Sequence, residues 1–393
     1  MSNIVAFDGN EAVAFAMKQI NPDVVAAYPI TPQTEIVQTF SQYVADGVVD
    51  TEFVPVESEH AAMSACIGAA VAGARAMTAT CGAGLALMWE MLWCASGMRL
   101  PIVMIVVNRS LSAPLNILTD QTDMMGVRDA GWIQIYAENH QEVYDNVIQA
   151  VRIAEHPEVM LPVICGHAGF TLGHTLGRLE VLPDEDVKRF VGEPKPIYSI
   201  LDVKSPKTFG ACAHSDYFFE FRRQQWDGME KALKVIPEVG EEFGRLTGRR
   251  YELVEEYRCE DADIICVIMG SAAGALREAI DYARERGVGV GMLKIRCFRP
   301  FPGDRVFDVP KVRKGVVVFD RVSAFGGDVS PLCADVCSSL YTRGEKNALI
   351  YGYIYGLGGR DTVPEEFIKV FDEVLSALKE GESFRMKFLG LRE

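Results

Sequence analysis

The stretch EFVPVESEHAAMSACIGAAVAGARAMTATCGAGLALMWEMLWCASG, residues 52–97, decides the fold class. It begins with a short apolar run at 52–56, which is followed by a small-residue helical pattern at 59–74. A second short apolar run at 76–80 is again followed by a helical pattern, at 84–97. Short apolar runs that alternate with longer helical patterns are typical of a parallel sheet with crossover helices. The stretch therefore predicts an α/β fold.

The same alternation extends in both directions along the chain. Further strands are predicted near residues 24–28, 102–107 and 160–165, and helices near 10–20, 32–44 and 141–154. A proline-containing irregular stretch and a charged helical stretch at 217–257 follow. A second alternating unit has strands near residues 264–269, 288–295, 315–319 and 348–354. We predict two doubly wound, mostly parallel sheet domains, residues 1–240 with an irregular extension and a connector helix, and residues 257–393.

The net charge of −15 excludes some classes of partner. Nucleic acids and anionic membranes reward basic surfaces, so neither is expected to bind, and an acidic protein would also be repelled. The N-terminus has no basic region ahead of its apolar residues, and the longest weakly polar run, at 61–74, is shorter than the ~20 residues that span a bilayer. We predict a cytoplasmic protein.

The ten cysteines contain no C-x-x-C pair, which argues against a zinc site or an iron-sulfur motif within this chain. They lie in apolar segments, so we expect buried free thiols. Walker A, G-x-S-x-G and H-E-x-x-H motifs are also missing from the sequence. The chain therefore lacks a complete catalytic set of a familiar kind.

Strand-to-helix loops of a parallel sheet fall on its carboxyl edge, where ligands bind. In YPITP, residues 28–32, Tyr28 and Thr31 each precede a proline, and Thr31 is predicted to cap a helix whose first residue is Pro32. A capped helix start also suits an anion. Arg109, which follows the strand at 102–107, is either a solvated loop residue or, with Thr31, a two-point carboxylate clamp.

Two more loops at this edge carry candidate residues. Glu57 and Glu59 open a small-residue helix, where one of them is expected to serve the helix dipole and the other can exchange a proton with a nitrogen heterocycle. Gly82 and Gly84 form a G-x-G turn, but the third glycine of a dinucleotide loop is replaced by Leu87. This turn therefore argues against nicotinamide binding.

Several blocks, in order, resemble alpha subunits of archaeal and bacterial pyruvate:ferredoxin oxidoreductases, members of the thiamine diphosphate-dependent 2-oxoacid:ferredoxin oxidoreductase family. The blocks are GNEAVAFAM (9–17), YPITP (28–32), ESEHAAMSACIGAAVAGAR (57–75), GLALMWEMLWCASGMRLPIVM (84–104), NRSLSAPLNI (108–117), RDAGWIQIYAEN (128–139), RPFP (299–302) and GLGGRD (356–361). The resemblance implies a pyrimidine-binding domain followed by a transketolase C-terminal-like domain.

The resemblance also implies roles for single residues. Glu59 would be the catalytic residue, hydrogen-bonded to N1′ of the aminopyrimidine ring of thiamine diphosphate. That bond would favour the imino tautomer of the ring, which takes the proton from the thiazolium carbon. Thr31 and Arg109 would contact the substrate carboxylate, which accounts for a threonine set between two prolines. The remaining residues expected at the cofactor are Tyr28, Pro29, Gly82 and Gly84. Relatives commonly have Ser-Gln where this chain has Gly82 and Ala83.

The resemblance further implies a multisubunit enzyme. This chain lacks the G-D-G and downstream Asn that hold magnesium and diphosphate, so that half of the site is expected on a beta subunit. Gamma and ferredoxin-like delta subunits, [4Fe-4S] clusters, ferredoxin and coenzyme A complete the expected system. No metal is expected in this chain, which should be inactive alone and form a dimer of heteromers.

Three alternatives to a pyruvate enzyme stay open. One is a 2-oxoisovalerate or other 2-oxoacid enzyme, because Thr31 and Arg109 contact only the part that all 2-oxoacids share. Another is a non-catalytic assembly subunit that keeps the fold, and a third is a nicotinamide-dependent dehydrogenase. The threonine at position 31 argues against a dicarboxylate substrate.

Overall fold

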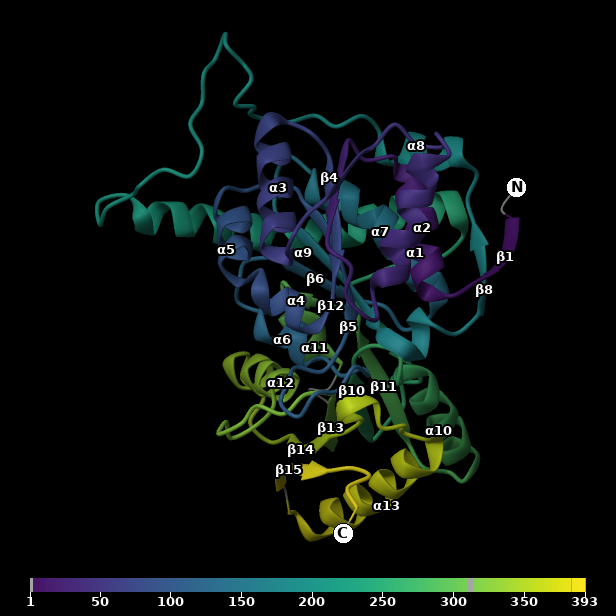
Figure 1. Ribbon diagram of the computed structural model, residues 1–393. Helices are drawn as coiled ribbons and strands as arrows, with labels where there is room; N and C mark the ends of the chain where they lie inside the picture. Colours follow the sequence, from purple (N-terminus) through teal and green to yellow (C-terminus); the bar gives the residue numbers. More distant parts are fainter. Residues whose placement is uncertain (1–2, 310–313, 383, 393) are drawn as a thin grey trace.

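The computed structural model describes residues 3–309, 314–382 and 384–392. Two lobes stack on each other, the upper one coloured purple to teal and the lower one green to yellow (Figure 1). Both have a mostly parallel sheet flanked by helices, which confirms the predicted fold class. Within the described residues, no helix has both the length and the apolar character that a membrane crossing needs.

The upper lobe contains a seven-stranded sheet in the order β12-β6-β7-β5-β4-β2-β3. Its parallel strands are β2 (Val24–Ala27), β3 (Glu52–Pro55), β4 (Ala76–Thr80), β5 (Val103–Asn108), β6 (Ile133–Tyr136) and β7 (Val163–Ala168). The edge strand β12 (Cys297–Arg299) comes from the C-terminal part of the chain and pairs antiparallel with β6. All parallel strands therefore end on one edge, as the site prediction requires.

The helices of the upper lobe follow the strands. They are α1 (Gly9–Ile20), α2 (Thr34–Ala45), α3 (Glu59–Ala72), α4 (Gly82–Leu87), α5 (Trp89–Gly97), α6 (Thr122–Gly126) and α7 (His140–Ala154). The single helix expected over 84–97 is divided into two helices. Helix α4 ends at Leu87, and α5 begins at Trp89 after Met88. Strand β6 was not predicted.

The irregular extension departs most from a compact lobe. After η1 (Gly169–Gly173), β8 (Gly177–Val181) pairs with β1 (Asn3–Phe7), and α8 (Asp184–Val191) follows. Residues 192–217, here called the arm, contain no helix or strand and project from the lobe before α9 (Phe218–Thr247) returns (Figure 1). The predicted helical stretch 217–257 is therefore partly wrong, since it ends in strand β9 (Val254–Tyr257).

The lower lobe contains a six-stranded sheet in the order β15-β14-β13-β10-β11-β9. The strands after β9 are β10 (Ile264–Ile268), β11 (Val290–Ile295), β13 (Gly315–Asp320), β14 (Leu349–Ile354) and β15 (Phe384–Phe388). The helices are α10 (Ala273–Glu285), α11 (Gly303–Asp308), α12 (Pro331–Thr342), η3 (Leu357–Gly359) and α13 (Pro364–Glu380). The domain limits 1–240 and 257–393 stay a prediction, and α9 runs past residue 240.

A buried ion network joins the two lobes. The Lys294 ammonium on β11 lies 2.5 Å from Glu138, 2.6 Å from Glu142 and 2.6 Å from Glu255. Burial alone would lower the pKa of Lys294, but the three carboxylates outweigh it and raise that pKa. Arg277 also pairs with Glu138 and Glu255. These carboxylates resemble a metal site in spacing, but the ammonium already fills their centre.

Candidate active site

The predicted site residues all lie at the carboxyl edge of the upper sheet. The loop after β2 carries Tyr28, Pro29 and Thr31, and Arg109 follows β5. Glu59 is the first residue of α3, and Gly82 is the first residue of α4. Tyr28 is 38% exposed, and Pro29 and Thr31 are exposed as well. The edge therefore collects these side chains from four separate loops.

The predicted cap at Thr31 is wrong. Helix α2 begins at Thr34, and its N-cap is Gln33, whose side chain makes no capping bond. Gln33 instead accepts from the Ile30 N–H at 3.2 Å and donates from Nε2 to the Ala79 carbonyl at 2.9 Å. A buried glutamine that ties the loop to β4 thus replaces the cap, and Thr31 stays exposed in the turn before the helix.

Thr31 and Arg109 do meet in the structure. Arg109 Nη1 donates to the Thr31 carbonyl at 2.9 Å, and Nε donates to the Asn116 carbonyl at 3.4 Å. The stem of Arg109 crosses Gly82, where an added Cβ would lie 3.1 Å from Arg109 Cγ and Cδ. Gly82 also has φ +46°, so both backbone and space favour glycine there. The Arg109 stem and the positive φ together give a physical reason for a glycine at position 82.

Asp123 holds these loops together, and sequence reasoning missed it. Its carboxylate accepts from the Gly82 N–H at 3.0 Å, the Arg109 N–H at 2.9 Å, Asn108 Nδ2 at 2.9 Å and the Met124 N–H at 2.8 Å. Burial raises the pKa of Asp123 to about 6, although these bonds favour the charged form. Asp123 lies on the short α6, with no sequence period to mark it. We call Thr31, Gly82, Arg109 and Asp123 the Asp123 corner.

Glu59 lies in a second group of residues. The Ser58 hydroxyl caps α3 by accepting from the Ala61 N–H at 3.2 Å, which places Glu59, only 5% exposed, in the first turn. A Cβ added to Gly84 would lie 2.5 Å from both Glu59 Oε1 and Thr80 Oγ1. The missing side chain of Gly84 therefore lets the backbone of α4 pack closely against both oxygens. We call Glu59, Thr80 and Gly84 the Glu59 corner.

The Thr80 hydroxyl is unusual. It is buried, and in the described parts of the chain it has no hydrogen-bond partner. A buried unpaired hydroxyl costs ~1–3 kcal/mol, so a native protein keeps one where something else satisfies it. Together with the Glu59 carboxylate, it offers hydrogen-bonding groups to a polar ligand. Thr80 was not predicted, because a threonine that ends a strand looks ordinary in sequence.

The lower lobe supports the loop that carries Arg109. Asn116 Nδ2 donates to the Gly358 carbonyl at 3.0 Å, and the Gly359 N–H donates to the Thr119 carbonyl at 2.7 Å. The Gln121 N–H donates to the Arg321 carbonyl at 3.0 Å. The GLGGRD segment therefore fixes residues of the loop after β5, which gives a physical reason for that block.

Comparisons with known proteins cover almost the whole chain. A family model described as "Pyruvate flavodoxin/ferredoxin oxidoreductase, thiamine diP-bdg" matches residues 15–241, and "Pyruvate:ferredoxin oxidoreductase core domain II" matches residues 262–367. The pyruvate synthase subunit PorA of Thermotoga maritima is 52% identical over 99% of this chain and 98% of its own length. The ketoisovalerate oxidoreductase subunit VorA of Pyrococcus abyssi is 42% identical over 95% and 94%.

Two solved structures share the fold. The 2-oxoglutarate:ferredoxin oxidoreductase of Magnetococcus marinus, with 2-oxoglutarate, coenzyme A and succinyl-CoA bound, matches with a TM-score of 0.71 and 20% identity. The match covers 94% of this chain but only 65% of that one. A split-gene transketolase, an inactive beta4 tetramer, matches with a TM-score of 0.54 and 13% identity, over 95% of this chain and 98% of that one.

Proposed function

The chain belongs to the pyruvate flavodoxin/ferredoxin oxidoreductase family, and from that premise we propose that it is the alpha subunit of a pyruvate:ferredoxin oxidoreductase. Its complex would convert pyruvate and coenzyme A to acetyl-CoA and carbon dioxide and pass two electrons to ferredoxin. The observation that carries the proposal is the Glu59 corner, where a buried carboxylate and a buried, unpartnered hydroxyl both lie against Gly84.

The Glu59 corner fits the aminopyrimidine of thiamine diphosphate, the cofactor of the matched family domain. Glu59 would hold and share a proton at N1′, and the Thr80 hydroxyl would gain the partner that it lacks. Burial strengthens both bonds, because the local dielectric is low. When bound, thiamine diphosphate supplies the nucleophilic carbon and the electron sink that decarboxylation of a 2-oxoacid requires.

The Asp123 corner would hold the substrate carboxylate. Two N–H groups of Arg109 bond the Thr31 and Asn116 carbonyls, which fixes the plane of the guanidinium. A guanidinium has five donors, so the others are left for a carboxylate. Thr31 is exposed beside it and would add its hydroxyl. The roles of Tyr28 and Pro29 at the cofactor remain proposals that rest on their place in this loop.

A branched 2-oxoacid is the second candidate substrate. The Pyrococcus abyssi relative named as a ketoisovalerate enzyme is 42% identical, and the Pyrococcus furiosus pyruvate synthase subunit is 45% identical. These two sequence identities are too similar to distinguish a ketoisovalerate enzyme from a pyruvate enzyme. The 52% identity with the Thermotoga maritima pyruvate synthase subunit supports pyruvate. A non-catalytic assembly role is disfavoured, because it gives no reason to keep Thr80 buried and unpaired.

We further propose the partners of the chain within a multisubunit complex. A beta subunit would carry the magnesium and diphosphate half of the site, gamma and ferredoxin-like delta subunits would carry electrons through [4Fe-4S] clusters, and the whole would form a dimer of heteromers. The ten free thiols of this chain support a reducing cytoplasmic compartment.

The test is tandem purification of the chain from its native host, followed by assays with a panel of 2-oxoacids, coenzyme A and a viologen acceptor. We expect an iron-sulfur complex that reduces the viologen fastest with pyruvate. A preference for a branched acid would replace only the substrate. A chain that purifies alone, or a complex that no 2-oxoacid reduces, would contradict the proposed function.

A further inference from the structure

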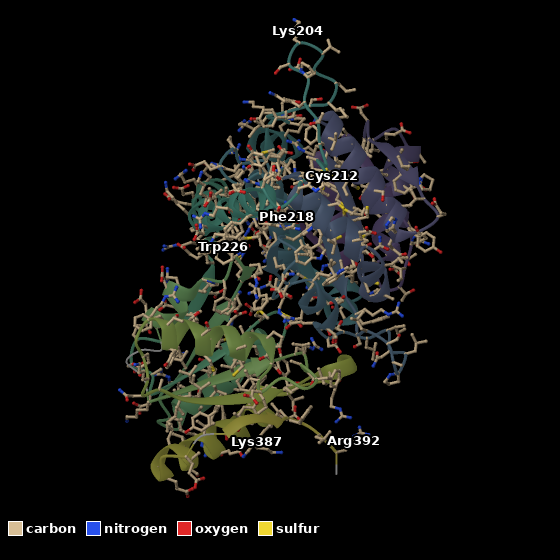
Figure 2. All side chains as sticks on the ribbon, turned by 90° about the vertical axis from the view of Figure 1, so that its left-hand side faces the viewer. Lys204, Cys212, Phe218, Trp226, Lys387 and Arg392 are labelled. Carbon is tan, nitrogen blue, oxygen red and sulfur yellow. The ribbon has the colours of Figure 1, made fainter. Side chains whose placement is uncertain are left out.

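A band of exposed apolar side chains covers one face of the upper lobe. Within it Phe219 is 80% exposed and Trp226 is 62% exposed. The other members are Leu87, Trp89, Phe218 and Phe221. Phe218 and Trp226 lie on the face turned toward the viewer in Figure 2. Large exposed apolar patches of this kind mark interaction surfaces.

The band is continuous from the Glu59 corner to the start of α9. Gly84 and Leu87 are both on α4, and Trp89 opens the next helix. The Trp89 and Trp93 rings are 6.0 Å apart, and the Arg222 guanidinium lies 5.5 Å from the Trp93 ring and 5.1 Å from the Phe218 ring. Contacts therefore lead from the cofactor site to the exposed aromatic end of α9.

The arm, residues 192–217, extends the same surface. It is fastened near its root, where Arg75 Nη2 donates to the Gly192 carbonyl at 2.9 Å, the Ser199 hydroxyl donates to the Ala72 carbonyl at 2.7 Å and the Ile200 N–H donates to the Val71 carbonyl at 3.0 Å. After Ile200, Leu201 is 68% exposed and Val203 is 87% exposed. Loops of this length without secondary structure are uncommon unless they serve a function.

The arm packs on the body through Phe209 but leaves a hollow beside it. A cavity of about 240 Å³ lies beneath its root, with Pro196, Tyr198 and Phe209 of the arm on one side and Met98 and Pro101 on the other. A hollow of that size accepts a large apolar side chain. The tip presents Lys204 and Lys207, both exposed, in a chain whose net charge is −15. The surface thus suits an apolar partner with carboxylates at its margin.

We propose that the aromatic band and the arm form the docking surface for the subunit that supplies the diphosphate half of the cofactor site. This inference rests on the proposed function, in which another chain must bring the diphosphate half of the site to the Glu59 corner. A chain that covers this corner must pass over α4, and the band begins there. The exposed end of α9 and the arm then hold the same subunit further from the chemistry.

Cys212 gives a direct test, because it is the exposed cysteine on the arm, whereas the other nine are buried or half-buried. We expect a maleimide to alkylate Cys212 at least ~10-fold more slowly in the purified complex than in the isolated chain. Half-buried Cys337, in the lower lobe, reports any general change of structure. Equal alkylation of Cys212 in the two samples would overturn the inference.

The partner is identified by a photo-crosslinking amino acid at position 219 in the complex. We expect the crosslink to join the subunit that binds magnesium and diphosphate. A crosslink to a second copy of this chain, to a cluster-bearing subunit, or to no subunit would overturn the inference.

A matched pair of double variants measures the contribution to binding. Phe218→Ser with Phe219→Ser is expected to weaken binding of the partner subunit about 100-fold, while Tyr282→Ser with Tyr341→Ser, exposed aromatics of the lower lobe, should leave it unchanged. All four residues are exposed, so the isolated chains should unfold at the same temperature. Equal binding by both variants, in a complex that still turns over 2-oxoacids, would overturn this inference alone. Failure of turnover with every 2-oxoacid would instead remove the proposed function.

Discussion

The Asp123 corner and the Glu59 corner lie on one sheet edge but satisfy their polar groups in opposite ways. Asp123 accepts four hydrogen bonds from its own chain, and Arg109 donates to two carbonyls. At the Glu59 corner, within the described residues, the Thr80 hydroxyl has no partner, and Gly84 lets α4 pack closely against it and against Glu59. The first corner is built to hold a cation still, whereas the second leaves a buried hydroxyl without a partner.

The largest expected effect is that of Glu59→Gln. The amide fills the same volume but cannot share a proton as a carboxylate does, so we expect turnover of the complex to fall ~10³-fold. Native mass spectrometry should show an intact complex. Turnover within tenfold of wild type would show that the Glu59 corner is not the catalytic one.

Gly84→Ala tests the close approach of α4 to Glu59 and Thr80. The new methyl would lie 2.5 Å from Glu59 Oε1 and Thr80 Oγ1, so we expect the Kd of the complex for thiamine diphosphate to rise ~10–100-fold, in line with overpacking costs of ~1–3 kcal/mol. Calorimetric titration measures it. Gly274→Ala is the control, because it is helical and no atom lies within 4 Å of its added Cβ.

Arg109→Lys tests the other corner. Lysine keeps the charge but loses the planar fork that bonds two carbonyls and a carboxylate at once. We expect KM for pyruvate to rise ~10–100-fold, while the Kd for thiamine diphosphate stays near wild type. Steady-state kinetics measure the first and calorimetry the second. A change in cofactor affinity alone would contradict the separation of the two corners.

Thr80→Val should separate stability from binding. Removing the unpaired hydroxyl should stabilise the isolated chain by ~1 kcal/mol, yet weaken the complex for thiamine diphosphate ~5-fold. Thr78→Val, on the same strand, is the control, because its hydroxyl donates to the Ala26 carbonyl at 2.7 Å and its loss should destabilise the chain by ~1 kcal/mol. Urea unfolding measures the change in the free energy of unfolding for each variant. Destabilisation by both variants would mean that Thr80 is already satisfied.

The smallest effect is a pH dependence. The pKa of Asp123 is about 6 in the folded chain against 3.8 ordinarily, so between these values the folded state holds a proton that the unfolded state has lost. The free energy of unfolding should therefore decrease as pH rises from about 4 to about 6. Asp123→Asn should reduce this slope. It should not abolish it, because burial raises the pKa of Asp320 to about 7.

The sequence predicted which loops meet at the carboxyl edge of the upper sheet, but not the buried polar residues that connect these loops. Strand and helix patterns placed Thr31, Glu59, Gly84 and Arg109 on one edge, because parallel topology fixes where loops fall. Gln33, Thr80 and Asp123 escaped, since their roles depend on contacts across loops that no local pattern encodes. The cap at Thr31 failed for the same reason: the bond from Gln33 to β4 outweighs a local preference.

Strand β12 delays completion of the upper sheet during synthesis of the chain. It closes the outer edge of the upper sheet, yet it follows β6 by more than a hundred residues. While the ribosome makes the intervening segment, β6 has an unpaired edge of the kind that invites aggregation. The Lys294 ammonium, which neutralises the half-buried Glu138 and the buried Glu142, also emerges late. Nascent chains should therefore rely on a chaperone until about residue 299 is translated.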